Sequence, residues 1–262
     1  MAGSGGDTNE IVQATKTSFE LLNRIRDTNG STLSELAADL DLAKSTTHRH
    51  LLTLERLEYV VREANEYYLA LRFLGLGESA RSRRPHFEHI RGNVETLAED
   101  TDERVQFIAE EHGKGVCVYR SAGKRAVETS PKVGARMSLH AIAAGKAILA
   151  FDTDMDLARL IESGLDAPTD QTITDPEQLK EELEDVRNQR YAVNRDEHID
   201  GLTAFGAPIR HPVEGVIGAL SISGPTNRLS DPDREEMVTT LLLGTVNEVE
   251  LNIAHGDSST RG

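Results

Sequence analysis

The sequence has no tryptophan, a single cysteine and no long apolar run. Cys117 alone cannot form an internal disulfide or a cysteine-rich zinc site, so a reducing cytoplasm is the expected compartment. No apolar stretch approaches the ~18 residues that a membrane helix needs, and no charged and then apolar leader opens the chain. We therefore expect a cytoplasmic protein with no membrane span and no secretory signal.

Basic residues are also few. The 262 residues include 29 Lys and Arg against 44 Asp and Glu, which gives a net charge of −15. Only 7 of the 29 are lysines, and the acidic excess is spread along the chain. Residues 11–77 hold 8 basic and 9 acidic side chains, a balance of −1, so the remaining −14 lies elsewhere. This pattern indicates a very salty cytoplasm, such as that of a halophilic archaeon, where long-range charge attraction is strongly screened.

Residues 33–54 predict two short helices joined by a three-residue turn, the layout of a helix-turn-helix. Their apolar faces are formed at helical spacing by Leu33, Leu36, Ala37 and Leu40 and then by Thr47, Leu51 and Leu54. Ser45, Thr46 and Arg49 would face outward, and such side chains bond guanine, phosphate or base edges in a major groove. On this segment alone, an amphipathic helix pair in an ordinary helical domain is an equal alternative.

The flanking segments favour the DNA-binding interpretation. Two β-prone runs at residues 56–62 and 67–69 enclose a polar segment that can turn a hairpin. Upstream, residues 15–26 predict a helix that ends at Asn29-Gly30. Its apolar residues are Phe19, Leu21, Leu22 and Ile25. Three helices and a hairpin make a winged helix, which Gly75-Leu-Gly77 is expected to close.

The rest of the chain predicts an antiparallel α+β domain. A charged connector at residues 78–84 leads to Pro85, which can open a helix over residues 86–100. The apolar side of that helix could also pack against a second copy; it consists of Phe87, Ile90, Val94 and Leu97. Strands are expected at residues 105–109, 116–119, 191–193, 202–209 and 216–223, with helices at 137–151, 175–189 and 231–255. Because the strands come as adjacent hairpins with helices between the pairs, a doubly wound sheet is disfavoured.

These elements divide the chain into five segments. We expect a disordered tail at 1–10, a winged helix-turn-helix at 11–77, a linker helix region at 78–100, an antiparallel-sheet domain at 101–256 and a second disordered tail at 257–262.

Two features of the second half suit a small ligand. Residues 138–149 place small side chains where a loop enters a helix, and free backbone N–H groups there favour a carboxylate or phosphate. The segment is no P-loop, because His140 and Ala147 stand where glycine and Ser or Thr are required. Ser221 and Ser223 share one face of a strand and need polar partners if buried. The alternatives are tight helix packing for the first feature and backbone bonding or solvent exposure for the second.

Catalytic interpretations have less support. Ser221, His198 and Glu197 could form a hydrolase triad, but no G-x-S-x-G elbow accompanies them. His140, Glu197, His198 and His211 could hold a metal ion, yet their spacings match no known ligand pattern. We therefore expect no catalytic residue, no metal site and no cofactor.

Taken together, the two halves resemble the isocitrate-lyase-regulator (IclR) family of transcription factors from about residue 11 to residue 255. The order and spacing of the matching segments are more specific than any one of them. They are Leu33-Ser-Glu-Leu-Ala37, Lys44-Ser-Thr-Thr-His-Arg49, Leu51-Leu-Thr-Leu-Glu55, Tyr67-Tyr-Leu69, Gly134-Ala-Arg136, Leu139-His140, Ala144-Gly-Lys-Ala147, residues 191–201 with Glu197-His198, Ala207-Pro208 and Gly218-Ala-Leu-Ser-Ile-Ser-Gly-Pro225.

The resemblance implies a winged-helix reader joined by a linker helix to a GAF-like effector domain. It also implies homodimers or homotetramers on palindromic double-stranded DNA, controlled by a small-molecule effector such as an organic acid or a sugar derivative. We expect the DNA contacts to come from Lys44, Ser45, Thr46, His48 and Arg49. The positions that match the ligand contacts of family members binding small keto acids are Met137, Ala143, Ala144, Asn194, Leu202, Ala204, Ser221 and Ser223. The alternatives are a sensory module without DNA reading and, less favoured, an enzyme acting on a small acid.

The sequence departs from the family pattern at five of these places. Asp41 replaces the usual glycine of the turn, although Asp tolerates the left-handed conformation. Thr47 and His50 stand where apolar residues are common. Asn194 takes an acidic position and Ala204 a larger one, so the identity of the effector does not transfer from relatives.

Overall fold

The structure, a computed structural model, describes residues 11–127, 132–153 and 157–259. It divides into two compact units between Arg83 and Arg84. The tail predicted at 1–10 lies outside the described residues. Of the tail predicted at 257–262, residues 257–259 are helical and the remainder lies outside the described part. No helix in the described ranges combines the length and apolarity needed to cross a membrane.

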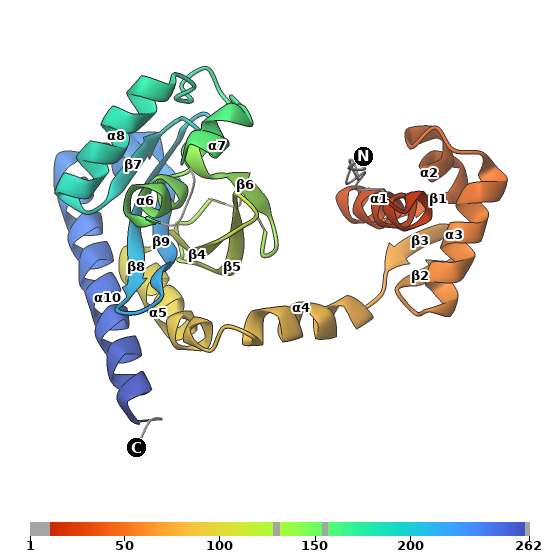
Figure 1. Cartoon of the computed structure of the whole chain (residues 1–262), viewed down its shortest axis with the longest axis horizontal. Coiled ribbons are helices and arrows are strands. Elements are labelled where there is room, and N and C mark those ends of the chain that lie inside the picture. Colours follow the sequence, from red (N-terminus) through yellow and green to blue (C-terminus); the bar gives the residue numbers. More distant parts are fainter. Residues whose placement is uncertain (1–10, 128–131, 154–156, 260–262) are drawn as a thin grey trace, which may run out of the picture. The chain divides into compact units, whose positions relative to one another are not determined.

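The first unit has the predicted three helices and hairpin (Figure 1). Its elements are α1 (Gln13–Thr28), β1 (Ser31–Thr32), α2 (Leu33–Asp39), α3 (Lys44–Arg56), β2 (Val60–Glu63), β3 (Glu66–Leu69) and α4 (Arg72–Ser82). The three strands form a small antiparallel sheet in the order β1-β3-β2. The sequence did not predict β1, because two residues are too short to show an alternating pattern.

The core of this unit joins the helices through Leu21, Leu36 and Leu51, which have no exposed surface. Local signals fix where α2 begins, since Thr32 and Glu35 form a complete capping box. Phe19 was expected on the apolar side of α1 but is 58% exposed. It is off the stripe of Leu21, Leu22 and Ile25 that the core covers, so that expectation was wrong.

Helix α4 runs past the predicted end of the winged-helix region. The sequence indicated a close at Gly77, then a charged connector over residues 78–84 within a linker helix region at 78–100, and α4 runs through both glycines to Ser82. Gly75 and Gly77 have no positive φ and no atom near the place of a Cβ. These glycines therefore lie on the surface of an ordinary helix, where glycine is tolerated at a cost in stability.

The second unit is built on one six-stranded sheet, and the α+β class is confirmed. All its strand pairs are antiparallel, in the order β6-β5-β4-β9-β8-β7. The strands are β4 (Arg104–Glu111), β5 (Lys114–Ala122), β6 (Arg136–Ser138), β7 (Ala192–Arg195), β8 (Leu202–His211) and β9 (Gly215–Pro225). The helices are α5 (His86–Thr101), η1 (Leu139–Ala141), α6 (Ala143–Phe151), α7 (Leu157–Glu162), α8 (Pro176–Gln189), α9 (Thr226–Leu229) and α10 (Pro232–Ser259).

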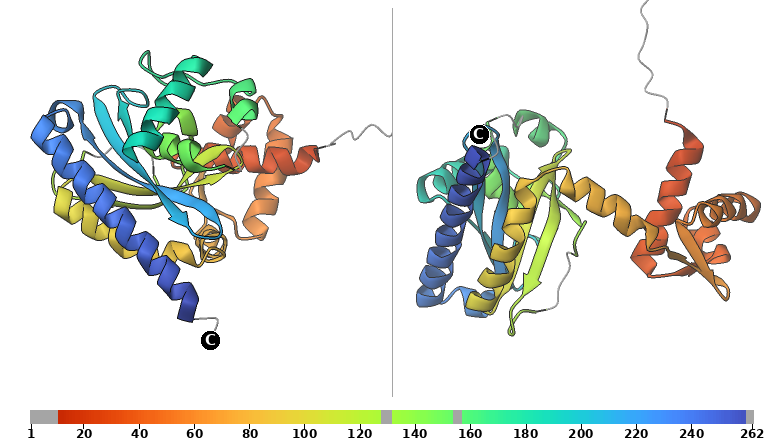
Figure 2. Two further views of the ribbon diagram at one scale, coloured as in Figure 1. Left: turned by 60° about the vertical axis from the view of Figure 1, so that its left-hand side comes forward. Right: turned by 90° about the horizontal axis from the view of Figure 1, so that it is seen from below.

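Helices cover both faces of this sheet (Figures 1 and 2). On one face α5 and α10 lie side by side, and on the other α6 and α8 pack together. The core between this face of the sheet and the two helices α5 and α10 buries four α5 side chains, Phe87, Ile90, Val94 and Leu97. The apolar side of the helix predicted at 86–100 is therefore satisfied within its own unit and does not need a second copy.

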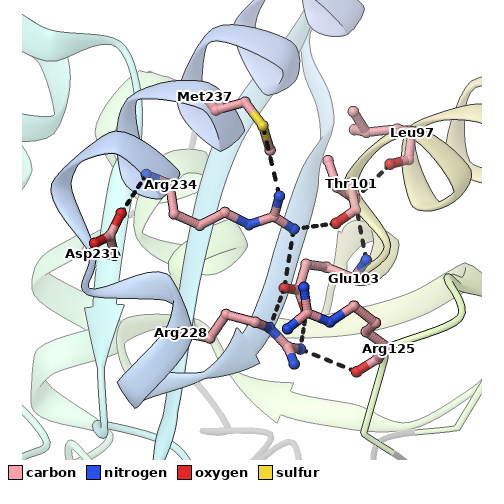
Figure 3. Close-up of polar contacts among 8 residues, drawn as sticks. All are labelled: Leu97, Thr101, Glu103, Arg125, Arg228, Asp231, Arg234 and Met237. Carbon is pink, nitrogen blue, oxygen red and sulfur yellow. Dashed lines mark hydrogen bonds and ion pairs between the residues drawn. The ribbon is translucent and has the colours of Figure 1, made fainter.

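A buried ion cluster links Glu103, the residue before β4, to arginines of α9 and α10 (Figure 3). The Glu103 carboxylate has no exposed surface and accepts hydrogen bonds from Nε and Nη2 of Arg228, at 2.6 and 2.5 Å. In α10, Arg234 Nη2 lies 3.3 Å from Glu103 Oε1. A Cβ at Gly224 would lie 2.4 Å from Glu103 Oε2, so only glycine leaves room for the carboxylate.

Candidate functional site

The five predicted DNA-contacting residues lie in the first two turns of α3. Lys44, Ser45, His48 and Arg49 are exposed, and Thr46 is half-buried. The opposite side of α3 is buried against the unit through Thr47, Leu51 and Leu54, as predicted. The helix thus presents a polar surface at its N-terminal end, where the helix dipole also favours phosphate.

The unusual residues of this motif have structural partners. Thr47 is fully buried, and its hydroxyl donates to the Ala43 carbonyl at 3.3 Å, so no polar atom is lost to the core. His50 Nδ1 lies 2.8 Å from the Ser18 hydroxyl of α1. Asp41 adopts φ 51°, the left-handed conformation expected at the turn. The helix-turn-helix therefore accommodates each of these three residues without an unpaired buried group or a disallowed backbone conformation.

All eight predicted effector-binding residues line one cavity of the second unit. The space open to the centre of a water molecule is about 40 Å³. The cavity lies on the α6 side of the sheet. The described residues that line it are Arg104, Gln106, Ile108, Met137, Ile142, Ala143, Ala144, Asn194, His198, Ile199, Leu202, Ala204, Ser221 and Ser223.

Strand register explains why these distant residues meet. A first cross-strand row runs Asn194, Ala204, Ser223 and Arg104 over four neighbouring strands. A second row runs Gly206, Ser221 and Gln106. Directly paired residues share one face of a sheet, so both rows point toward α6.

The first turn of α6 lies directly over the second row. A Cβ at Gly206 would lie 2.4 Å from the Ala143 carbonyl carbon and the Ala144 nitrogen. Glycine at this place lets the backbone amides of the helix start approach the strand closely. The helix entrance and the strand hydroxyls, which the sequence indicated separately, therefore face one space.

The serine hydroxyls remain available to a ligand. Ser221 and Ser223 are only 7% and 6% exposed, and neither hydroxyl makes a hydrogen bond within the part of the chain that the structure describes. The Asn194 amide, by contrast, is committed to the protein. It donates to the Ala141 carbonyl at 2.5 Å and accepts from the Glu197 N–H at 3.2 Å.

The loop after β7 closes the cavity with His198 and Ile199. An ion cluster holds this loop, because the fully buried Lys146 ammonium lies 2.8 Å from Glu197 and 2.7 Å from Glu182. Burial raises the pKa of Glu197, and the ammonium offsets part of the rise. Burial also lowers the pKa of His198, so this side chain is neutral at pH 7.

The sequence did not indicate five residues of the lining, and it suggested His198 only for a hydrolase triad or a metal site. Of the five, Arg104 and Gln106 are polar and alternate with the buried Val105 and Phe107. That alternation of polar and apolar residues in a strand with no exposed face was the available signal. The other three are the aliphatic Ile108, Ile142 and Ile199.

The catalytic and metal alternatives do not assemble. Glu197 faces Lys146 rather than His198. His140 Nε2 lies 2.8 Å from the Asp166 carbonyl, and His211 stacks on His86 with ring centroids 4.8 Å apart. Within the described ranges, no three His, Cys, Asp or Glu side chains cluster as metal ligands would.

Comparison with known proteins covers both units. Residues 17–64 match the model of the IclR helix-turn-helix domain, and residues 80–250 match that of the bacterial transcriptional regulator IclR C-terminal region. The probable HTH-type transcriptional regulator ArcR of Halobacterium salinarum is 32% identical over 96% of this chain and 97% of its own length. The transcriptional repressor IclR of Escherichia coli is 29% identical over 92% of this chain and 89% of its own.

Solved structures show the same fold. An IclR transcriptional regulator from Alicyclobacillus acidocaldarius has a TM-score of 0.78 at 24% identity, covering 93% of this chain and all of that one. An IclR homologue from Microbacterium hydrocarbonoxydans, complexed with 4-hydroxybenzoate, has a TM-score of 0.72 at 22% identity, covering 90% and 98%. The paired helix-turn-helix and effector-binding regions establish that the chain belongs to the IclR family of DNA-binding transcriptional regulators.

Proposed function

We propose that this regulator controls a catabolic pathway through a small-molecule effector held in the cavity under α6. The observation that carries the proposal is that all eight expected effector contacts line this one cavity. The Microbacterium homologue was solved with an aromatic acid. Here the space open to the centre of a water molecule is about 40 Å³, so we propose a small organic acid or sugar-derived metabolite.

We further propose that Lys44, Ser45, Thr46, His48 and Arg49 contact a palindromic operator. A palindrome requires two copies of α3, so the active form is a homodimer or a pair of homodimers. A chromosomal target and the single cysteine support a cytoplasmic location. The effector would act by binding one arrangement of the dimer better than another, which changes the spacing of the two recognition helices.

Replacement of Arg49 by alanine tests the DNA-reading surface. If the guanidinium donates two hydrogen bonds to one guanine, Arg49→Ala weakens operator binding by about 1–3 kcal/mol. The measurement is a fluorescence-anisotropy titration with operator DNA found by footprinting upstream of the gene and its neighbours. Arg56→Ala, at the far end of the same helix, is the matched control and should leave affinity nearly unchanged.

Equal affinities for the two variants would remove Arg49 from the contact set. Absence of any protected site would favour the alternative of a sensory module that works through protein contacts, which the net charge of −15 also suits.

A thermal-shift screen tests the cavity. A ligand that binds only the folded protein raises its melting temperature. We expect at least one small organic acid to do so, and Ser221→Ala to reduce the shift. An acid that stabilises both proteins equally would place the effector elsewhere.

A further inference from the structure

One permanently charged side chain, that of Arg104, stands among the described residues of the cavity. The fourteen lining residues within the described ranges include no Asp or Glu and no other Lys or Arg. Arg104 is 1% exposed. Asn194, which also lines the cavity, is an uncharged amide, so these lining residues contain a positive group and no carboxylate.

The neighbouring carboxylate does not serve the cavity. Glu103 precedes Arg104 in the chain, and side chains of successive residues in an extended chain point to opposite faces. Its carboxylate lies in the ion cluster with Arg228 and Arg234, on the α10 side (Figure 3). Arg104 takes part in a further interaction within the chain, and its guanidinium carries five donors, enough to serve a ligand as well.

Hydrogen-bond donors converge beside this charge. Arg104 is the direct cross-strand partner of Ser223, and Gln106 is that of Ser221. Both serine hydroxyls lack a partner within the described chain and are more than nine-tenths buried. A carboxylate offers two acceptor oxygens, which such a set of donors matches.

We infer that Arg104 is the specificity-determining residue that restricts the effector to a small monocarboxylate, with the guanidinium as its charge partner and Ser221 and Ser223 as donors. This inference rests on the proposed function of the cavity as the effector site. In a buried site the attraction between the guanidinium and a carboxylate is weakly screened by salt, whereas a neutral molecule of the same shape forms no ion pair with it.

The test compares acids with amides of the same size. Isothermal titration calorimetry on the full-length protein would use acetate, propionate, lactate and pyruvate, each against acetamide, propionamide, lactamide or pyruvamide. We expect at least one acid to bind about 10- to 100-fold more tightly than its amide. Arg104→Gln should reduce that ratio to near one, and Arg104→Lys should restore part of it.

Arg91→Gln, on the exposed side of α5, is the matched control and should keep the full preference. Folding of each variant is checked by circular dichroism and by operator binding. If Arg104→Gln does not fold, the ratio in the wild-type protein and in Arg104→Lys still decides.

Equal binding of acid and amide, or a full preference in Arg104→Gln, would overturn the role of Arg104 while leaving the cavity as the effector site. Failure of every acid to bind a protein that still binds its operator would overturn the monocarboxylate assignment and leave DNA reading intact. Failure of the wild-type protein to bind any operator DNA would instead count against the proposed function.

Discussion

At the scale of single residues, Glu103 is the most consequential charge outside the cavity. Its carboxylate is fully buried between two arginines (Figure 3). Breaking a buried ion cluster from one side leaves charges that neither water nor protein compensates. The residue is therefore a structural anchor between the start of β4 and the α9–α10 segment.

Glu103→Gln should lower the free energy of unfolding by about 3–5 kcal/mol. Urea denaturation followed by circular dichroism measures this loss. Glu99→Gln, an exposed residue of α5, is the control and should change stability by less than about 0.5 kcal/mol. Two variants of equal stability would mean that the arginines find other partners.

Cys117 gives a second prediction at this scale. The thiol is 1% exposed, and burial raises its pKa to about 11. Only the thiolate reacts with disulfide reagents, and at pH 8 about one thiol in a thousand is ionised. Ellman's reagent should therefore label the native protein at least about 100-fold more slowly than the urea-unfolded protein. Rapid stoichiometric labelling of the native protein would show that the thiol is accessible.

At the scale of elements, α4 is the last helix of the first unit, and it contains two exposed glycines, Gly75 and Gly77. Gly75→Ala and Gly77→Ala place a methyl group in open space and should each stabilise the helix by about 0.5–1 kcal/mol. Amide hydrogen exchange in α4 should slow correspondingly. Gly134→Ala, at φ 82°, is the opposite case and should destabilise the protein. Unchanged exchange in α4 would indicate that other contacts hold this helix.

The predictable elements are those with a complete local signal. The helix α8 has Asp175 as its cap, Pro176 in its first turn and Leu179, Leu183 and Val186 on one side, and it forms as expected. The same holds for the hairpin of β8 and β9 around residues 211–215. By contrast, glycine occurs both within exposed helices and where helices end. Gly75 and Gly77 therefore could not show from the sequence whether α4 continues or stops there.

The cavity was only partly predictable, for a different reason. Ser221, Ser223 and the entrance of α6 carry signals in their own segments. Arg104 and Gln106 enter the cavity only because β4 pairs with β9, more than a hundred residues later in the chain. Such long-range register is not written in either strand alone.

At the scale of the whole molecule, the charge of −15 predicts a dependence on salt. Like charges on the folded chain repel one another, and salt screens them over about 10 Å at 0.1 M and 3 Å at 1 M. The melting temperature should rise by about 5 °C or more between 0.05 and 1 M KCl. Choline chloride should act alike if screening is the cause. A melting temperature that stays flat in both salts would contradict the interpretation of the acidic surface as an adaptation to high salt.

The adjacency of Glu103 and Arg104 also constrains which insertions and deletions this lineage can accept. The two residues point to opposite faces of the sheet, and the turn before them contains Asp102 at φ 55°. Adding or removing one residue there would shift the strand by one position and exchange the faces. A carboxylate would then enter the cavity, and a guanidinium would meet Arg228 and Arg234. The length of this turn therefore matters more to the cavity than its composition, and we expect related regulators that keep both residues to keep the turn without gaps.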